Sequence, residues 1–221
     1  MIDIVIPVRD APSMYDDLEL KFCLRSIEKH MPGVSSVWLI GIPRPHLSVY
    51  WIEQPDEGPT RYDSTRKKLL AACACPHVSD PFLLFNDDFF LLRPPPPEIP
   101  DYYDGTIHER IASAGGDYRA AMIETLPYSD GRNYGVHVPL VIDKALFKRT
   151  ARPGMLYRNV YCSASPRPKA QMADPKIYNH EDHLNFRRFI QGKWMFSASE
   201  HSFAYIYSHM KQMYSDKSRW E

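Results

Sequence analysis

The sequence predicts an α/β protein built around a mostly parallel sheet, and three observations lead to this prediction. Short apolar segments alternate with amphipathic helical segments through residues 1–92. One of them, Phe82–Phe85, is continuously apolar, which is typical of a strand buried on both faces. It runs directly into Asn86, Asp87 and Asp88. Because an unpaired buried carboxylate is costly, we expect the strand to end at this triplet, which then lies at the strand's carboxyl end.

The helices of the first half are placed by apolar periodicity and by capping residues. Apolar residues recur at helical spacing after Asp16, which stands three residues before Glu19 as in a capping box. Asp63 or Ser64 is expected to cap the second helix. The elements expected here are strands over residues 2–7, 37–41, 49–52 and 82–85, and helices over residues 16–31 and from residue 63 onward. This β-α-β-β-α-β order is typical of a Rossmann-like sheet.

The second half of the sequence is less regular. The polyproline segment Pro94–Pro97 cannot join the interior of a sheet, so we expect it to cross the surface. Residues 157–175 are rich in Pro, Ser, Arg and Lys, which predicts a loop. The further elements expected are a strand over residues 134–142, a helix from Asp143, and a helix opening at residues 178–183 whose core side uses Leu184, Phe186 and Ile190.

Composition indicates one globular domain, or one domain with a smaller appendage, without a membrane-spanning helix. Hydrophobic residues make up 44% of the 221 residues, and no apolar run is long enough for a membrane span. The first residues form an apolar strand without a basic, signal-like region, so we expect a cytoplasmic protein. The four cysteines lack the paired spacing of a zinc site and are expected to be reduced thiols.

The charge of the chain is unevenly distributed. Residues 1–142 contain 13 Lys and Arg against 20 Asp and Glu, whereas residues 143–221 contain 14 against 7. A basic tail of this kind suggests an anionic partner. The alternative is that the two halves present surfaces of opposite sign that attract each other.

The triplet Asn86, Asp87 and Asp88 has the composition of a metal site. Open α/β sheets bind their ligands at the carboxyl ends of the strands. Two carboxylates and an amide oxygen at that place suit a hard divalent cation, Mn²⁺ or Mg²⁺, that itself holds a phosphate. The alternative is a turn rich in Asn and Asp that only caps the next element.

These residues carry a resemblance to known families. The order of elements through residue 92 resembles the nucleotide-binding half of GT-A glycosyltransferases, in which an Asp-x-Asp motif ends the fourth strand. Residues 20–30 (LKFCLRSIEKH) and 85–88 (FNDD) more narrowly resemble the Stealth-type capsular polysaccharide phosphotransferases. The segment His137-Val138-Pro139 resembles a later histidine-containing segment of that family. In this chain Asn86 replaces the first Asp of the motif.

The resemblance implies a Rossmann-like GT-A fold with a C-terminal acceptor-side extension. A single domain over residues 1–221 would then comprise a nucleotide-binding half (1–92) and an acceptor-side half (93–221). The implied activity is a metal-dependent glycosyltransferase that moves a sugar from a nucleotide sugar, preferably a UDP-sugar, to a carbohydrate hydroxyl. Two alternatives are transfer of a whole sugar phosphate, as the Stealth type implies, and glycosylation of modified DNA, which the basic tail keeps open.

The triplet has a distinct expected role at each position. Asp88 is expected to contact the metal directly, and Asp87 to share the cation or bind it through water. Asn86 is expected to hydrogen-bond the ribose or the sugar in place of the usual Asp. A bound cation would neutralise the charge that develops on the diphosphate as its bond to the sugar breaks.

Two further segments are expected to bind the nucleotide. Pro7, Arg9 and Asp10 come at the end of the first strand, where the position in the fold predicts contact with base and ribose. Asp63 and Arg66 lie in a basic helix start that offers an anion both cations and free N–H groups. For these segments the alternatives are an ordinary surface turn and a solvated basic helix face.

The acceptor hydroxyl requires a base, and the late acidic residues are the candidates. Glu181 and Asp182 open a predicted helix, and inverting GT-A enzymes often place an acidic base at such a site. Acidic residues are also common in a first helical turn because they complement the helix dipole. The resemblance implies that His201 is an additional metal ligand, with His209 as the competing residue for that role; the alternative for either is an ordinary surface histidine.

A hypothesis from a different class is a nucleic-acid-binding module whose basic tail makes the contacts. In that case the acidic triplet would be structural. The balanced total charge, with 27 Lys and Arg and 27 Asp and Glu, argues against a general nucleic-acid binder.

Overall fold

The protein is described here by a computed structural model, which describes residues 2–11, 13, 15–178 and 184–221. The described elements follow one another as β1 (Ile4–Pro7), α1 (Leu18–His30), β2 (Val37–Gly41), β3 (Tyr50–Glu53), α2 (Arg61–Ala74), β4 (Phe82–Leu84), β5 (Phe89–Leu91), β6 (Asp101–Tyr103), α3 (Ile107–Ser113), α4 (Gly116–Thr125), the 3-10 helix η1 (Leu126–Tyr128), β7 (Leu140–Ile142), α5 (Lys144–Thr150), α6 (Tyr157–Ala164), β8 (Lys169–Gln171), β9 (Lys176–Ile177), α8 (Phe186–Ile190), β10 (Met195–Ala198) and α9 (Glu200–Met213).

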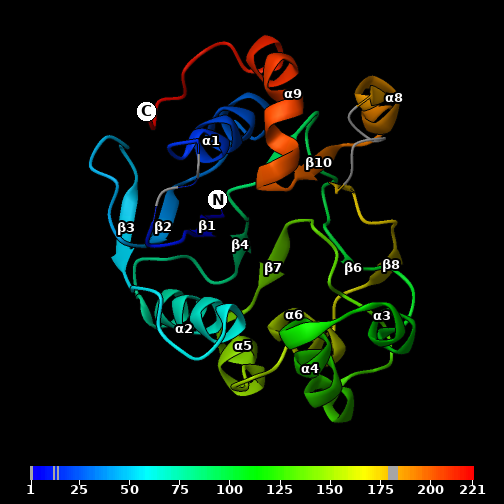
Figure 1. Cartoon of the computed structure of the whole chain (residues 1–221). Coiled ribbons are helices and arrows are strands. Elements are labelled where there is room, and N and C mark those ends of the chain that lie inside the picture. Colours follow the sequence, from blue (N-terminus) through cyan, green and yellow to red (C-terminus); the bar gives the residue numbers. More distant parts are fainter. Residues whose placement is uncertain (1, 12, 14, 179–183) are drawn as a thin grey trace.

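The central sheet has five strands in the order β3-β2-β1-β4-β7 (Figure 1). β1 to β4 run parallel, and β7 is antiparallel to β4. Val5 of β1 pairs with Trp38 of β2 on one side and with Leu84 of β4 on the other. The predicted mostly parallel α/β sheet is therefore confirmed. After β1 the chain forms β2 and β3 on one side of it and then β4 on the other side. The topological switch point therefore lies between β1 and β4.

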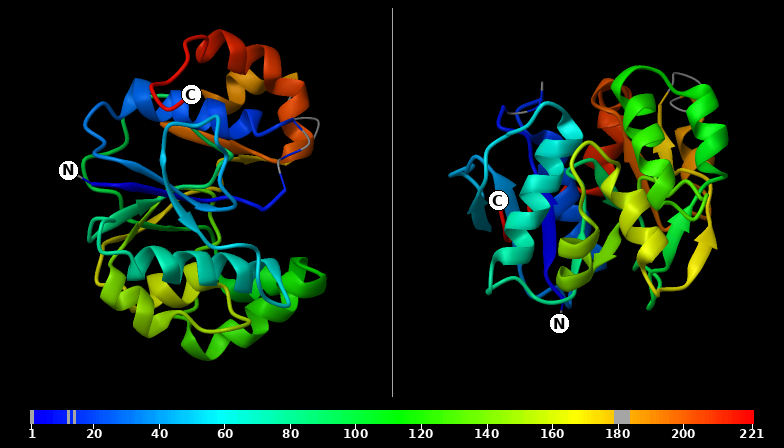
Figure 2. Two further views of the ribbon diagram at one scale, coloured as in Figure 1. Left: turned by 90° about the vertical axis from the view of Figure 1, so that its left-hand side faces the viewer. Right: turned by 90° about the horizontal axis from the view of Figure 1, so that it is seen from below.

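Helices cover both faces of this sheet, as continuously apolar strands require (Figure 2). Ile4 and Ile6 of β1 belong to the core cluster that includes α1 and α9. Val5, between them, belongs to the cluster on the opposite face, which includes α2 and α5. Successive side chains of a strand point to opposite faces, so one short strand holds both layers together.

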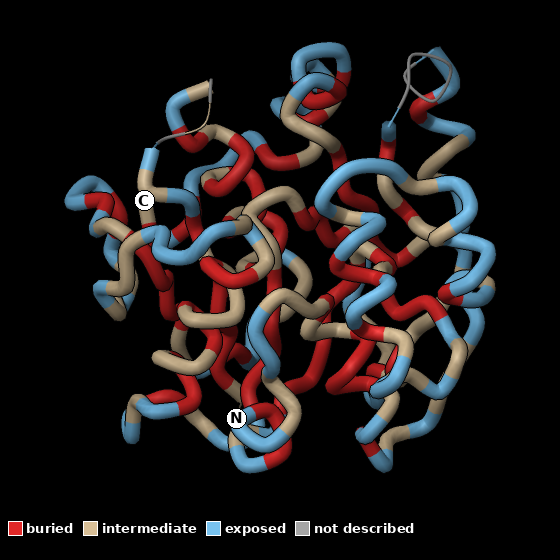
Figure 3. Tube along the Cα trace, turned by 60° about the horizontal axis from the view of Figure 1, so that its bottom comes forward, coloured by how far each residue is buried: buried red, intermediate tan, exposed pale blue. Residues whose placement is uncertain are grey.

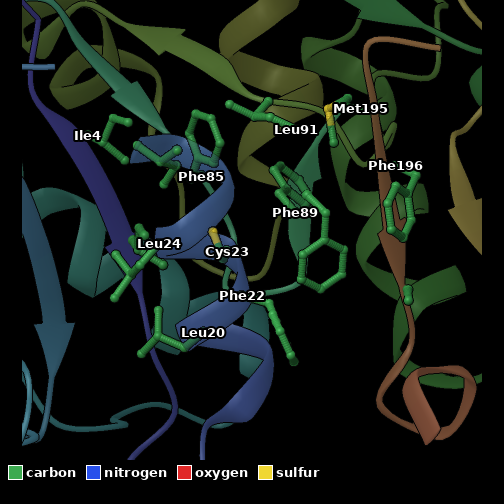
Figure 4. Packing of buried hydrophobic residues seen from close by; sticks show 14 of the residues in the cluster. Ile4, Leu20, Phe22, Cys23, Leu24, Phe85, Phe89, Leu91, Met195 and Phe196 are labelled. Carbon is green, nitrogen blue, oxygen red and sulfur yellow. The ribbon is translucent and has the colours of Figure 1, made fainter. Parts of the chain in front are cut away.

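Two phenylalanines fix the acidic triplet in place. Phe85 and Phe89 stand on either side of it, and neither is exposed to solvent. Figure 4 shows Phe85 beside Ile4 and Phe89 in the space between α1 and β10. Burial of each ring contributes about 1.5–3 kcal/mol, so the turn between them is held firmly at both ends.

Two smaller sheets complete the fold. One has the order β5-β10-β9, and the other pairs β6 with β8. β10 is antiparallel to β5 and parallel to β9. Figure 3 shows that the buried residues concentrate toward the interior, whereas the outer loops and helix faces are exposed. Because β5 follows the triplet directly, the first of these sheets brings Lys176 of β9 beside Asp88.

The two predicted helix caps of the first half are wrong. The first helix begins at Leu18 after Asp17, which has a positive φ of 55° and makes no capping hydrogen bond. Glu19 does not complete a capping box with Asp16, because its carboxylate accepts a hydrogen bond from the Ser13 hydroxyl at 2.6 Å. The second helix is capped by Thr60, three residues before Asp63. In both cases contacts outside the helix decide where the helix starts.

The predictions for the second half hold only in part. The strand expected over residues 134–142 is confined to Leu140–Ile142. The loop expected over residues 157–175 instead contains α6 and β8. The helix expected from Asp143 is present as α5, and Asp143 caps it by accepting from the backbone N–H of Leu146 at 2.6 Å.

The helix expected near residue 178 is only partly described. Phe186 is buried, as predicted, but Leu184 is 73% exposed, so its expected core position is wrong. The polyproline segment lies outside every sheet, in agreement with its expected course over the surface. No helix in the described ranges is long and apolar enough to cross a membrane.

Candidate functional site

A cavity of about 540 Å³ opens at the carboxyl ends of β1 and β4, the switch point of the central sheet. Pro7 ends β1, Arg9 follows it, and Asn86 and Asp87 follow β4, so four of the predicted site residues meet here. Basic side chains from five separate segments also line the cavity; they are Arg9, Arg61, Arg110, Arg158 and Lys176. Among the described lining residues Asp87 is the only carboxylate, so basic groups outnumber acidic ones on the cavity wall.

The two carboxylates of the triplet have different surroundings. Asp87 lines the cavity, and no described side chain hydrogen-bonds it. Burial and the neighbouring charge of Asp88 raise the pKa of Asp87 to about 7. The charge of Arg9 opposes this shift without cancelling it. Asp87 is therefore the carboxylate that gains most from an added cation.

Asp88 is held by the smaller sheet. Its Oδ2 atom accepts hydrogen bonds from Lys176 Nζ at 2.8 Å and from the Ser197 hydroxyl at 2.9 Å. Burial disfavours its charged form, but Lys176 and then His137 outweigh this effect and lower the pKa of Asp88. Its Oδ1 atom is buried and has no hydrogen-bond partner. The structure thus supplies one ammonium group to Asp88 and leaves one oxygen without a partner.

The triplet fits a divalent cation on these observations. An orphaned carboxylate oxygen on Asp88 and a carboxylate with a raised pKa on Asp87 both call for additional positive charge. Carboxylate oxygens are ligands that Mg²⁺ and Mn²⁺ accept, with the remaining positions filled by phosphate and water. No group of three or more His, Cys, Asp or Glu suited to a metal occurs in the described part of the chain.

Arg9 connects the strand end to the last helix. Its guanidinium forms an ion pair with Glu200 at 3.0 Å and lines the cavity beside Pro7. Arg9 and Pro7 also line an adjoining hollow of about 340 Å³, which lies along the start of α2. The two spaces share Pro7, Arg9, Arg61 and Thr65 as lining residues.

Asp10, Asp63 and Arg66 occupy framework positions and do not line the larger cavity. The Asp10 carboxylate accepts the backbone N–H of Asp56 at 2.8 Å, which clasps two loops together. Asp63 Oδ1 accepts the backbone N–H of Gly154 at 2.9 Å. The same oxygen lies 3.8 Å from Arg66 Nε. The cavity is instead lined by Arg61 and other residues of the same helix start.

A histidine–aspartate pair lies on the cavity wall. His137 Nδ1 is 2.9 Å from Asp174 Oδ2, and the His137 backbone N–H donates to the other oxygen of Asp174. The Tyr178 hydroxyl donates to the same Oδ2 atom at 2.8 Å. Burial acts to raise the pKa of Asp174, but the hydrogen bond and charge of His137 outweigh it, and the pKa is lowered. With Nδ1 facing a carboxylate, Nε2 is the proton acceptor of the neutral imidazole.

Arg158 holds the backbone on either side of this histidine. It donates to the carbonyl oxygens of Val136 at 3.2 Å and Val138 at 2.8 Å, and it forms no ion pair with a described carboxylate. Arg158 lies in α6, within the segment expected to be a loop, and Asp174 lies in the same segment. Neither was a candidate from the sequence. The only available signal was the histidine-containing segment His137–Pro139.

The remaining predicted site residues lie away from the described cavity wall or outside the described residues. Glu181 and Asp182 fall in the range 179–183, which the structure does not describe. His201 is exposed near the start of α9, with its ring 5.8 Å from that of Tyr205. His209 stacks on Phe186 at 4.9 Å, which is a packing role. The metal role of His201 stays a prediction.

No protein-family model matches the sequence, and no curated protein matches it either. What the molecule itself supplies is a mostly parallel α/β sheet with a cationic cavity at its switch point, a strand-end carboxylate and a histidine–aspartate pair.

Proposed function

We propose that the chain is a transferase of the GT-A type that binds a nucleotide-activated sugar and moves its sugar phosphate to a hydroxyl acceptor. The observation that carries this proposal is the joint placement of Asp87, five basic side chains and His137 around one cavity at the sheet's switch point. Cavities at this position are where open α/β sheets bind nucleotides. The acceptor is proposed to be a carbohydrate.

Charge favours transfer of a phosphoryl group over transfer of the sugar alone. The transition state of glycosyl transfer resembles a positively charged oxocarbenium ion, which carboxylates stabilise. Phosphoryl transfer develops negative charge on oxygens, which Arg and Lys stabilise. Because Asp87 is the only carboxylate among the described lining residues, against five Arg and Lys, the surroundings match the second reaction better.

The proton of the acceptor hydroxyl is assigned to His137. The acceptor oxygen forms a bond to the phosphorus that carries the sugar, and the bond from that phosphorus to the bridging oxygen breaks. A nucleoside monophosphate leaves, and Nε2 of His137 takes the acceptor proton. Asp174 orients the ring and stabilises its charged form through the 2.9 Å contact to Nδ1. Glu181 and Asp182 remain the alternative bases from the sequence.

A divalent cation would be held by Asp87 and Asp88, with Asn86 beside it. When bound, it would neutralise charge on the phosphate oxygens of the donor. Lys176, which already pairs with Asp88, and Arg9 supply further positive charge on the same side of the cavity.

A second candidate is the glycosyl transfer predicted from the sequence, with a UDP-sugar as donor. The placement of the Asp87 carboxylate directly in the cavity favours it. The leaving group separates the two reactions, because sugar transfer releases the nucleoside diphosphate and sugar-phosphate transfer releases the monophosphate. Product analysis of a reaction with a UDP-sugar, Mn²⁺ and an oligosaccharide acceptor distinguishes them, and we expect UMP.

Two variants test the assigned residues in that assay. His137→Gln should lower kcat by a factor of about 10² or more while UDP-sugar binding is unchanged. Asp87→Asn should remove the Mn²⁺-dependent part of the stabilisation by UDP in thermal melting. His209→Gln is the matched control, because this histidine packs on Phe186 outside the cavity.

The results that would contradict the assignments are specific. Full activity of His137→Gln together with loss of activity in Glu181→Gln or Asp182→Asn would transfer the role of base to the acidic pair. An unchanged Mn²⁺-dependent shift in both Asp87→Asn and Asp88→Asn would remove the metal site from the triplet.

A further inference from the structure

One wall of the cavity carries two arginine–tyrosine pairs. Arg61 and Tyr62 begin α2, Arg110 lies in α3 and Tyr118 in α4, and all four line the cavity. The guanidinium carbon of Arg61 is 5.0 Å from the centre of the Tyr62 ring, and that of Arg110 is 5.8 Å from the centre of the Tyr118 ring. The two tyrosine rings are 6.0 Å apart at an angle of 35°. We call these four residues the arginine–tyrosine wall.

The charges of this wall are not neutralised by the described protein. Arg9 and Lys176, on the strand-end side, form ion pairs with Glu200 and Asp88. In contrast, no described carboxylate forms an ion pair with Arg61 or Arg110. The side-chain hydrogen bond of Arg61 is to the Tyr62 hydroxyl, at 2.8 Å. The wall therefore keeps its positive charge available to a ligand.

The wall adjoins the histidine–aspartate pair. The Tyr118 hydroxyl packs against Gly135, where an added Cβ would lie only 2.9 Å from it, and Gly135 is two residues from His137. Burial acts to lower the pKa of Arg110, but Tyr118 and then the charges of Tyr178 and Asp174 outweigh it and raise the pKa. The wall and the proposed base His137 therefore line the same cavity.

From this geometry we infer that the arginine–tyrosine wall is the acceptor subsite and that the acceptor is an anionic saccharide, bearing phosphate or carboxylate. The inference rests on the proposed function and adds the chemical class of its second substrate. Arg61 and Arg110 bind the acidic group, and the tyrosine rings provide a face for the sugar ring. The donor phosphates are left to Arg9, Lys176 and the triplet.

The test compares three probes of similar size: glucose 6-phosphate, glucuronate and glucose. Their affinities are measured by NMR titration in the presence of UDP and Mn²⁺. We expect at least one acidic sugar to bind about tenfold or more tightly than glucose, because two exposed guanidinium groups contribute. If only glucose 6-phosphate binds tightly, the acidic group of the acceptor is a phosphate. If only glucuronate binds tightly, that group is a carboxylate.

The double variant Arg61→Gln/Arg110→Gln should lose the preference for acidic sugars and retain UDP binding. Both residues are exposed, so the variant should remain folded, which thermal melting checks. Arg119→Gln is the matched control, since Arg119 is an exposed residue of α4 outside the cavity.

Equal affinity for all three probes, or no binding of any of them, would overturn the inference while leaving UDP binding as independent support for the proposed function. Loss of UDP binding in the double variant would also overturn it, because the arginines would then serve the donor. Failure of the wild-type protein to bind UDP or a UDP-sugar with Mn²⁺ would instead contradict the proposed function.

Discussion

At the scale of single residues, a buried lysine shows how charge fixes the loops beside the cavity. The side chain of Lys68 is 3% exposed, and its ammonium group donates to the Val8 carbonyl and to the Asp56 carboxylate, both at 2.6 Å. The Asp10 carboxylate lies 3.7 Å away, and Asp10 and Asp56 each donate the backbone N–H to the carboxylate of the other. A buried ammonium group requires such partners, so this cluster clasps the loops that follow β1 and β3.

The clasp predicts a pH-dependent stability difference for Asp56→Asn. Burial acts to raise the pKa of Asp56, but hydrogen bonds from Lys68 and Ser64 outweigh it and lower the pKa to about 2. A lowered pKa in the folded state stabilises the protein above the ordinary pKa and loses this effect as pH falls toward 2. We expect the variant to be less stable by about 1–2 kcal/mol at pH 7, since solvent screens the 41% exposed carboxylate.

Urea unfolding at several pH values measures this difference. It should stay constant from pH 7 to about pH 5 and shrink below about pH 4, because Asp56 of the unfolded chain then binds a proton while the folded carboxylate, with its pKa of about 2, stays charged. Glu57→Gln is the control, because its ion pair with Lys67 is largely exposed and should contribute little. A difference that widens in acid would rule out the proposed role of the Asp56 charge.

At the scale of elements, α6 shows how tertiary contacts build a helix from a segment with loop composition. Residues 157–164 contain Arg, Asn and Ser, yet Val160, Tyr161 and Cys162 are buried against the sheet. The Tyr161 hydroxyl accepts from the Asp143 backbone N–H at 2.8 Å and donates to the Val141 carbonyl at 3.0 Å. One side chain therefore ties α6 to the end of β7 and to the start of α5.

Tyr161→Phe should lower the free energy of unfolding by about 1–3 kcal/mol, because it leaves a buried N–H and a buried C=O without their partner. Urea unfolding monitored by circular dichroism measures the change. Tyr128→Phe removes a hydroxyl from a 42% exposed tyrosine and serves as the control, with little expected effect. Equal stability of the two variants would show that α6 does not depend on this contact.

At the scale of the whole molecule, the uneven charge of the sequence is partly used inside the fold. Lys169, Lys176 and Arg219 of the basic segment form ion pairs with Asp101, Asp88 and Glu28 of the acidic one. This favours the interpretation in which the two halves attract each other. The basic tail consequently has fewer free charges for an external polymer than the count of residues suggested.

Duplex DNA should therefore bind weakly or not measurably at about 0.15 M salt. A filter-binding titration at several salt concentrations measures this, with Arg187→Gln/Arg188→Gln on α8 as the test variant and Lys148→Gln/Arg149→Gln on α5 as the control of equal charge. Neither variant should alter UDP-sugar binding. Tight binding with a steep salt dependence that only the α8 variant flattens would make DNA the acceptor.

How far the sequence predicts the site depends on the distance between the residues concerned. Pro7, Asn86 and Asp87 were found because strand ends can be located from local patterns, and parallel strands bring these ends to one edge. Asp174 and Arg158 could not be found, because the composition of their segment predicted a loop and their partners lie far away in the chain. Asp174 lies 37 residues from His137, to which it is hydrogen-bonded. Arg158 lies 20 residues from Val138, whose carbonyl it binds.

The sequence by itself determined the mostly parallel sheet and the position of the acidic triplet at its edge, because an apolar strand cannot continue through two carboxylates. Only the tertiary structure decided that Asp87 lines the cavity while Asp88 is held by Lys176, 88 residues away. It likewise decided which cations are neutralised and which stay available. Hydrophobic periodicity records only whether a residue is buried, whereas the partner of a charge depends on which distant elements pack together.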